Sequence, residues 1–257
     1  MDKKGKHTHI LVIRLSAMGD VAMTVPVIRA LTDQYPEIQL TVLTKKPFRP
    51  IFDGLENVEV KEADVRFDAV ADLHNVLRSR ILKKYFALES IPFAQIDKGR
   101  KDKKALTRTK NKVFEQLKST HERYADVFAK LGFPIDLSNT KPLERVQLSE
   151  KVLSLVQHDT KKWVGIAPFA AHQSKMYPLE STKEVIKALN NTDKYKILLF
   201  GGGAKEVEVL EGLAKDYQNA ECMAGKLSLS EELQLISNLD VMLSMDSGNA
   251  HMATNYG

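Results

Sequence analysis

Residues 9–34 read HILVIRLSAMGDVAMTVPVIRALTDQ, and this stretch indicates the fold class of the chain. His9–Arg14 is a short, mostly apolar run of the kind found in parallel strands that are covered on both faces. Val21–Gln34 has apolar residues at helical spacing, so the turn Leu15–Asp20 joins a strand to a helix. In an open α/β sheet such a turn lies at the carboxyl end of a strand, where ligands bind.

The same alternation of strand and helix repeats along the chain, which is typical of a doubly wound α/β fold. Further strands are predicted at Gln39–Thr44, Asn57–Lys61, Ala69–Leu73, Ile91–Ile96, Trp163–Pro168, Tyr195–Gly201 and Asp240–Ser244. Further helices are predicted at Val76–Phe86, Ser119–Leu131, Ser181–Leu189, Ala204–Tyr217 and Ser230–Ser237.

One segment interrupts this alternation. Residues 132–148, GFPIDLSNTKPLERVQL, contain Gly, Pro and Asn, and we interpret them as a linker between two α/β domains. The expected domains are residues 1–140 and residues 149–257. Only three convincing strands follow the linker, and the chain stops at Gly257 soon after the last of them. We therefore expect the second sheet to be incomplete, with a poorly covered edge.

The composition is that of an ordinary globular chain. It has 257 residues, of which 43% are hydrophobic and 28% are charged. The single cysteine, Cys222, excludes a disulfide framework and a cysteine-rich zinc site and favours a reducing, cytoplasmic compartment. No apolar stretch approaches the length of about 18 residues expected of a membrane-spanning helix. We expect no metal site, because the sequence contains no Asp-x-Asp pair.

Positive charge is concentrated in the first half of the chain. Residues 1–145 carry 27 Lys and Arg against 19 Asp and Glu, whereas residues 146–257 carry 11 against 14. The densest run is Lys98–Lys104, followed by Arg108, Lys110 and Lys112. This run is either a solvated, flexible loop or a loop that binds phosphate or an anionic membrane surface. Binding of nucleic acid is less favoured, because Phe114 is the only aromatic residue nearby.

The turn Leu15–Asp20 contains the first candidate catalytic residue. It has one glycine, Gly19, and so lacks the Gly-x-Gly-x-x-Gly pattern of a dinucleotide-binding turn. Asp20 either caps the helix that follows or acts as a base. Helix N–H groups lower the pKa of a carboxylate and weaken it as a base, so a catalytic Asp20 should point partly into a cleft.

Two glycine-containing turns follow predicted strands in the second half. Gly201–Gly203 precedes the helix at Ala204 and lacks the Gly-Lys-Ser/Thr ending of a P-loop. It is either a plain tight turn or a ligand-binding one, and Glu206 either interacts with the helix dipole or accepts a hydrogen bond from a ribose. The second turn is Asp246-Ser247-Gly248, whose first two residues either cap the next helix or lie where a diphosphate binds.

Two further residues of the second half are candidates. His251 lies about one turn into the helix after Gly248, where it is either a ligand-binding or a structural histidine. Lys175 lies in Ser-Lys-Met-Tyr-Pro just before a helix, a position where lysines are usually solvated. Neither residue indicates a function by itself.

Taken together, these elements resemble the ADP-heptose:lipopolysaccharide heptosyltransferases of glycosyltransferase family 9. The elements are the LSAMGD turn, Lys-x-Tyr-Pro, Gly-Gly-Gly-x-x-Glu and Asp-Ser-Gly-x-x-His, and the similarity is closest over Ile10–Leu31. The resemblance covers essentially the whole chain. It implies a GT-B architecture, with two Rossmann-like domains facing each other across a cleft, the acceptor on the N-terminal side and the nucleotide sugar on the C-terminal side.

The resemblance also implies a mechanism. Asp20 would remove a proton from the acceptor hydroxyl during an inverting displacement, and Lys175 would offset charge on the diphosphate without a metal. The donor would be ADP-heptose, no separate cofactor would be needed, and the acceptor would be the lipid A/Kdo inner core at the inner membrane. The nucleotide sugar would be bound by Gly202, Glu206, Asp246, Ser247, Gly248 and His251, and the acceptor phosphates by Arg100, Lys101, Lys103 and Lys104.

Two other classes of function remain open from the sequence. One is a different nucleotide-sugar enzyme of the same two-domain shape, such as another glycosyltransferase or an epimerase. The other is a basic module that binds nucleic acid, which would show a steep dependence on salt.

Overall fold

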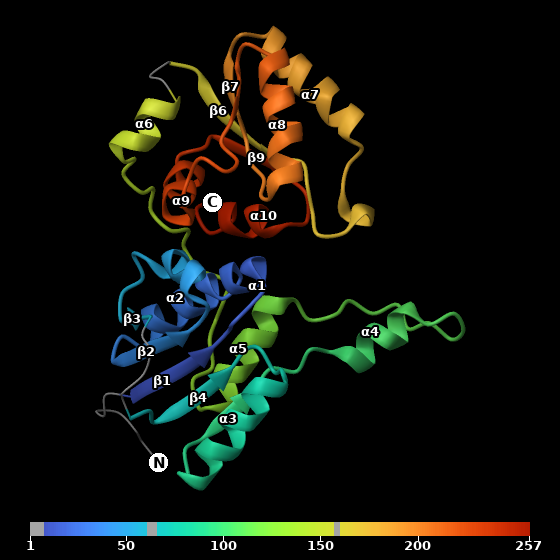
Figure 1. Ribbon diagram of the computed structural model, residues 1–257. Helices are drawn as coiled ribbons and strands as arrows, with labels where there is room; N and C mark the ends of the chain where they lie inside the picture. The colour runs from blue at the N-terminus through green and yellow to red at the C-terminus, as the bar shows by residue number, and fades with distance from the viewer. Residues whose placement is uncertain (1–7, 61–65, 157–159) are drawn as a thin grey trace. The chain divides into compact units, whose positions relative to one another are not determined.

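The computed structural model describes residues 8–60, 66–156 and 160–257, and the chain divides into two units, Met1–Lys141 and Pro142–Gly257 (Figure 1). Each unit has its own sheet, and every strand pair in both sheets is parallel. The doubly wound α/β class predicted from the sequence is confirmed.

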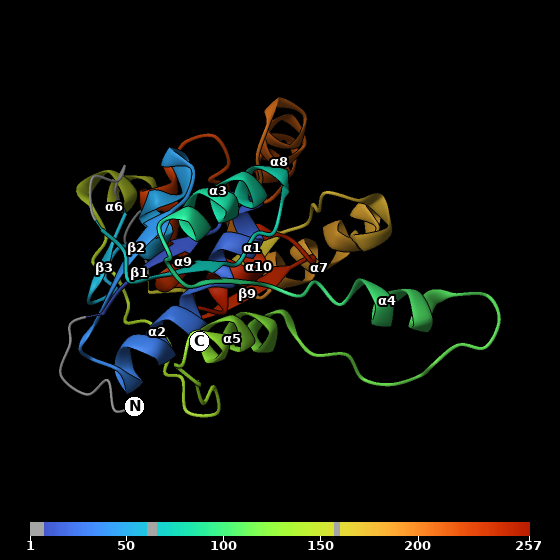
Figure 2. The same ribbon diagram turned by 90° about the horizontal axis from the view of Figure 1, so that it is seen from below.

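In unit 1 the strand order is β3-β2-β1-β4-β5. Its strands are β1 Thr8–Ile13, β2 Ile38–Leu43, β3 Val58–Glu59, β4 Ala69–Asp72 and β5 Phe93–Gln95. Its helices are α1 Met18–Ala22, α2 Val25–Gln34, the 3-10 helix η1 Lys46–Phe52, α3 Leu77–Leu88, α4 Arg100–Thr107 and α5 Thr120–Lys130. Seen from below, α3 lies on one side of the sheet and α2 and α5 lie on the other (Figure 2).

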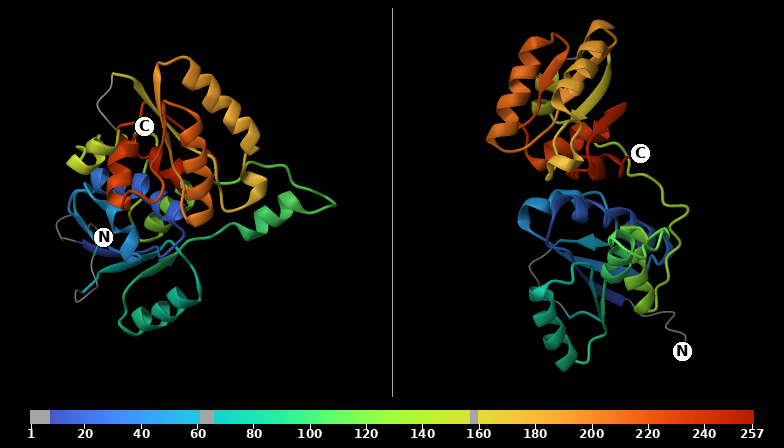
Figure 3. Two further views of the ribbon diagram at one scale, coloured as in Figure 1. Left: turned by 45° about the horizontal axis from the view of Figure 1, so that its top comes forward. Right: turned by 90° about the vertical axis from the view of Figure 1, so that its right-hand side faces the viewer.

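In unit 2 the strand order is β8-β7-β6-β9. Its strands are β6 Lys162–Ala167, β7 Tyr195–Leu199, β8 Ala220–Cys222 and β9 Val241–Ser244. Its helices are α6 Glu150–Val156, the 3-10 helix η2 Gln173–Lys175, α7 Leu179–Asn191, α8 Ala204–Asp216, α9 Leu229–Ser237 and α10 Gly248–Ala253. Helices α7 and α8 pack on one face of this sheet through Ile186, Leu210 and Leu213, and α6 and α9 lie on the other side (Figure 3).

Both units wind in the same way. In each, the first strand is central, the next two strands extend to one side of it, and the fourth strand pairs with its other side. The strand order therefore reverses between β1 and β4 in unit 1 and between β6 and β9 in unit 2. Outside the carboxyl ends of strands at such a reversal, α/β sheets leave a crevice in which ligands bind.

Three predictions about the elements were wrong. The helix predicted over Val21–Gln34 is two helices, because Pro26 at the start of α2 cannot donate the hydrogen bond that would continue α1. The second domain has four strands, not three, since Ala220–Cys222 forms β8. The basic run is not simply a loop, since Arg100–Thr107 forms α4.

Two other features of the elements bear on the predictions. Strand β9 lies at an edge of its sheet, with Val241 58% exposed and Leu243 38% exposed. The strand predicted over Asn57–Lys61 is the two-residue β3. Lys61, the last residue of the prediction, lies outside the described residues.

Candidate functional site

Several candidate residues follow the strands between which the strand order of each sheet reverses. In unit 1, Asp20 follows β1 and Asp72 ends β4. In unit 2, Lys175 follows β6 and Asp246 follows β9. These are the two strand pairs at which the strand order reverses, so each unit places charged side chains where ligands of α/β sheets bind.

Asp20 is held by a buried arginine. The distance from Arg14 Nη2 to Asp20 Oδ2 is 2.5 Å, and the Arg14 side chain is 7% exposed. Arg14 Nη1 also donates a hydrogen bond of 2.6 Å to the carbonyl of Leu73, just beyond the end of β4. The Arg14 guanidinium therefore links the end of β4 to the turn after β1 and fixes the position of the Asp20 carboxylate.

Asp20 contributes to the start of α1, and its carboxylate is still accessible. The residue before α1 is Ala17, and Asp20 lies in the first turn, where its Oδ2 accepts the backbone N–H of Ala17 at 3.2 Å. Both of its contacts use Oδ2, and the side chain is 40% exposed. Asp20 therefore ties down the start of the helix and still presents its carboxylate to solvent.

The turn after β4 contributes residues that the sequence reasoning missed. Buried Asp72 accepts the backbone N–H groups of His74 and Asn75, each at 2.9 Å, and the side-chain amide of Gln95 at 2.8 Å. Burial, together with the positive charges of Arg14 and Lys98, lowers the pKa of His74. A signal was present in the sequence, since a buried strand ends in Asp72-Leu73-His74 just as β1 ends in a polar turn.

A tyrosine of α5 contacts both Asp20 and Arg14. The Tyr124 hydroxyl donates a hydrogen bond of 3.2 Å to the backbone carbonyl of Asp20. The Arg14 guanidinium carbon lies 5.8 Å from the centre of its ring, within the range of a cation–π contact. Tyr124 is fully buried, and burial raises the pKa of its hydroxyl. The raised pKa keeps the hydroxyl protonated, as its hydrogen bond to Asp20 requires.

In unit 2, three of the predicted residues come together. Lys175 Nζ lies 2.5 Å from Asp246 Oδ2, and His251 Nε2 lies 3.8 Å from Asp246 Oδ1. The hydrogen bond from Lys175 lowers the pKa of Asp246. Lys175 also lines a cavity of about 590 Å³ with Tyr177 and Leu243, among other residues. A cation, a carboxylate and an imidazole are thus gathered at the ends of β6 and β9.

Ser247 is the N-cap residue of α10, but its side chain bonds elsewhere. Its hydroxyl is 3.1 Å from the Ser244 hydroxyl, and it makes no side-chain cap hydrogen bond to α10. Gly248 is the first residue of the helix. Ser247 therefore occupies the N-cap position without a side-chain capping hydrogen bond, and the Asp246 carboxylate pairs with Lys175 instead.

The turn Gly201–Gly203 is held by a side chain of the helix that follows it, α8. Glu206 Oε2 accepts the backbone N–H of Gly202 at 2.8 Å, across the first turn of α8. Gly203, just before the helix, has φ +84°, a conformation that favours glycine. Glu206 therefore shapes the turn, and a contact with a ribose stays a prediction.

The structure separates the four basic candidates of unit 1 into two pairs. Arg100 and Lys101 line a cavity of about 330 Å³. The other lining residues are Asn75, Arg80, Asp97, Lys98, Gly99 and Asp102. Lys103 and Lys104 are exposed on α4 and do not line this cavity.

Two absences concern residues 8–60, 66–156 and 160–257. Within them, no three His, Cys, Asp or Glu side chains are grouped so that they could hold a metal ion. Across the same residues, no helix is both long enough and apolar enough to cross a membrane.

Comparison with known proteins gives a consistent result. A family model described as glycosyltransferase family 9 (heptosyltransferase) matches residues 62–257. The lipopolysaccharide core heptosyltransferase OpsX of Haemophilus influenzae is 23% identical, over 96% of this chain and 76% of its own length. Lipopolysaccharide heptosyltransferase 1 of Campylobacter coli is 24% identical, over 95% of this chain and 80% of its own length.

A solved structure has the same fold. The E. coli heptosyltransferase WaaC with ADP-2-deoxy-2-fluoro heptose matches with a TM-score of 0.69 at 19% identity. The match covers 97% of this chain and 86% of that one.

Proposed function

The chain belongs to glycosyltransferase family 9, and from this premise we propose that it transfers a heptose from ADP-heptose to the lipid A/Kdo inner core of lipopolysaccharide. Membership makes it a glycosyltransferase, and its two parallel-sheet units have the GT-B fold. The relatives it matches are named as heptosyltransferases acting on lipopolysaccharide. The observation that carries the proposal is the family match together with charged residues at both strand-order reversals.

In this proposal, unit 2 binds the donor. Lys175 offers a cation that is 45% exposed, and its ion pair with Asp246 holds it at the ends of β6 and β9. A diphosphate bound there interacts with the positive charge of Lys175, and with that of His251 when the imidazole is protonated. The proposed nucleotide-binding set also includes Gly202, Glu206, Ser247 and Gly248.

Unit 1 supplies the base. Asp20 accepts the proton of the attacking acceptor hydroxyl while the oxygen of that hydroxyl forms a bond to the anomeric carbon. The bond from that carbon to the ADP oxygen breaks on the opposite face, so the configuration inverts. Because Arg14 and the Ala17 N–H both hold Oδ2, the carboxylate is oriented before the acceptor arrives.

The charge that develops on the departing ADP is offset by Lys175 in this proposal, without a metal ion and without a separate cofactor. A mono-cation at this position interacts with the phosphate oxygens through charge-assisted hydrogen bonds. The metal-independent mechanism therefore rests on Lys175, and the rate of transfer should be the same with and without EDTA.

The acceptor belongs to unit 1. Arg100, Lys101, Lys103 and Lys104 present positive charge on α4, in the half of the chain that carries the excess of Lys and Arg. Their proposed ligands are the phosphates and acidic sugars of the lipid acceptor. The same charge would favour a position at the cytoplasmic face of an anionic membrane, without insertion.

A panel of nucleotide sugars tests the donor part of the proposal. ADP-heptose should raise the melting temperature, and UDP, GDP and CMP sugars should raise it less, because a ligand stabilises the folded protein by mass action. A larger rise with a UDP sugar would contradict the proposed donor. It would favour a different nucleotide-sugar enzyme, such as an epimerase.

A further inference from the structure

Residues 98–118 form a basic segment between β5 and α5, which we call the α4 segment. Helix α4 and the chain after it extend away from the rest of unit 1 (Figures 1 and 2). No residue of α4 is buried. The segment contains two acidic residues, Asp102 and Glu115, among many Lys and Arg. Packing of α4 therefore does not hold it in place, and its position depends on its two ends.

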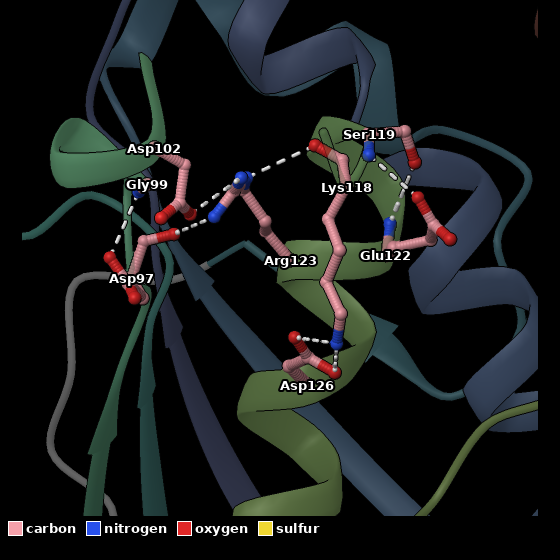
Figure 4. A network of polar contacts seen from close by, with 8 residues as sticks. All are labelled: Asp97, Gly99, Asp102, Lys118, Ser119, Glu122, Arg123 and Asp126. Carbon is pink, nitrogen blue, oxygen red and sulfur yellow. Dashed lines mark hydrogen bonds and ion pairs between the residues drawn. The ribbon is translucent and has the colours of Figure 1, made fainter. Parts of the chain in front are cut away.

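Both ends of the α4 segment are bound by one guanidinium group, that of Arg123 in α5 (Figure 4). Arg123 Nε donates a hydrogen bond of 3.1 Å to the carbonyl of Lys118, at the end of the segment. Arg123 Nη1 donates a hydrogen bond of 3.2 Å to the carbonyl of Asp97, just before its start. The side chain is 9% exposed, and its Nη2 is 3.9 Å from Asp102 of α4.

The first turn of the segment is fitted closely to this guanidinium. Gly99 has φ +59°, and a Cβ added to it would overlap the guanidinium of Arg123. The Gly99 N–H donates a hydrogen bond of 2.9 Å to Asp97 Oδ1, which closes the turn. A glycine is therefore needed here both for its backbone conformation and for the approach of Arg123.

The residues next to this turn line the cavity of about 330 Å³ described above. Lys98 lies between Asp97 and Gly99, and Arg100 and Lys101 follow directly. Arg80 of α3 adds a fourth cation. Burial, followed by the positive charges of Arg14 and Arg100, lowers the pKa of Lys98. Asp97 and Asp102 line the same cavity, so its four cations outnumber its two carboxylates, and the excess of positive charge favours an anion.

We propose that Arg123 is a positioning residue for acceptor binding: it fixes the turn at residues 97–102 so that the cations of this cavity receive an anionic phosphate or carboxylate group of the acceptor. This inference rests on the proposed function, because it assumes an anionic acceptor in unit 1. Arg123 itself does not line the cavity and acts through the backbone of Asp97. A lysine in its place would keep the charge but could not reach both carbonyls at once.

Arg123→Lys is the test variant, and Lys118→Met is the matched control. The Lys118 side chain pairs with Asp126 at 2.7 Å, whereas Arg123 uses its backbone carbonyl, so Lys118→Met leaves both ends of the segment bound. Arg123→Lys should raise the acceptor KM roughly tenfold to a hundredfold, with the donor KM within twofold of wild type. Lys118→Met should leave both values near wild type.

Limited proteolysis gives a second readout that does not depend on transfer. Trypsin should cleave within residues 98–112 of native Arg123→Lys roughly tenfold faster than in wild type or Lys118→Met, measured by mass spectrometry. An unchanged acceptor KM, or equal rises in donor and acceptor KM, overturns the positioning role. If wild type transfers no sugar at all, the proposed function fails, and an unchanged cleavage rate then overturns the role of Arg123 separately.

Gly99→Ala keeps the inference testable if Arg123→Lys does not fold. It leaves α5 and the donors of Arg123 intact but places a methyl group against the guanidinium. It should raise the acceptor KM and the cleavage rate in the same direction as Arg123→Lys. A folded Gly99→Ala protein with wild-type acceptor KM and wild-type cleavage would contradict the inference.

Discussion

Asp20 has the features that a general base requires at the scale of one residue. Its position is fixed by Arg14 and by the N–H of Ala17, and its carboxylate is still partly exposed. Arg14 is buried and is itself anchored on the Leu73 carbonyl. Fixed geometry with an accessible proton acceptor is what a displacement reaction needs from its base.

Asp20→Asn should lower kcat roughly 10²–10⁴-fold, because the amide cannot accept the proton of the acceptor hydroxyl. The affinity for ADP, measured by calorimetry, should stay within twofold of wild type. Asp68→Asn is the matched control, since Asp68 accepts the backbone N–H of His9 near the opposite end of β1. A kcat above one third of wild type in Asp20→Asn would rule out Asp20 as the base.

Lys175→Met should weaken ADP binding roughly tenfold or more, because hydrogen bonds to charged groups contribute about 1.5–3 kcal/mol. The measurement is the Kd for ADP by calorimetry. Lys183→Met serves as the control, since Lys183 pairs with Glu180 on α7 of the same unit. Equal Kd values for Lys175→Met and Lys183→Met would show that Lys175 does not contact the diphosphate.

Among the elements, α4 carries the four cations that we propose bind the acceptor. Replacing Arg100, Lys101, Lys103 and Lys104 together by Ala should raise the acceptor KM about tenfold and flatten its dependence on salt. The helix should persist, because alanine favours helices and no α4 residue is buried. Donor KM should hardly change. Steady-state kinetics at several salt concentrations is the measurement.

Double variants distinguish the pair Arg100 and Lys101 from the pair Lys103 and Lys104. Arg100→Ala with Lys101→Ala should account for most of the rise in acceptor KM, because these two residues line the cavity and Lys103 and Lys104 do not. A quadruple variant with wild-type acceptor kinetics and salt dependence would make α4 a solvated helix without a role in acceptor binding.

Helix α9 gives a prediction about pH. Hydrogen bonds from the Ser228 backbone N–H, from Lys151 and from the Ser228 hydroxyl lower the pKa of Glu231 from 4.5 to about 2. Because the pKa is lower in the folded protein, the ionised Glu231 carboxylate stabilises the fold. This stabilisation is fully present above about pH 4.5 and is lost as the pH falls through about 2. Glu231→Gln should therefore melt below wild type at pH 6, with the gap closing towards pH 2. A gap that does not change with pH would contradict this.

The elements were largely predictable from the sequence because apolar periodicity reports burial. Buried runs such as Ile10–Ile13 mark central strands directly. Two elements were not predicted. The three residues of β8 are too few to show a pattern, and α4 has no apolar face that packs on the rest of unit 1. The break between α1 and α2 was missed, although Pro26 was visible, because the apolar spacing continues across it.

The site was predictable only in part, for a related reason. Asp20 and Asp246 follow strands in recognisable turns. Lys175 and His251 carry no such local signal, yet the structure brings both of them to Asp246. The roles of Arg14 and Arg123 depend on contacts with the Leu73 and Asp97 carbonyls, which lie far away in the sequence. No local pattern reports such contacts.

At the scale of the whole molecule, the two units share one winding and differ in charge. Each places its charged residues at a reversal of strand order, but the excess of Lys and Arg belongs to the first half of the chain. This division fits a donor held by unit 2 and an anionic acceptor held by unit 1, as proposed for this member of family 9.

The most direct test follows labelled sugar. The purified chain is incubated with ADP-heptose labelled in the sugar and with a Kdo-lipid A acceptor, with and without EDTA, and the label is counted in the lipid and soluble fractions. We predict that the label moves to the lipid at the same rate in both conditions, and that Asp20→Asn abolishes most of this transfer. Label that stays in the soluble fraction with wild-type protein would contradict the account.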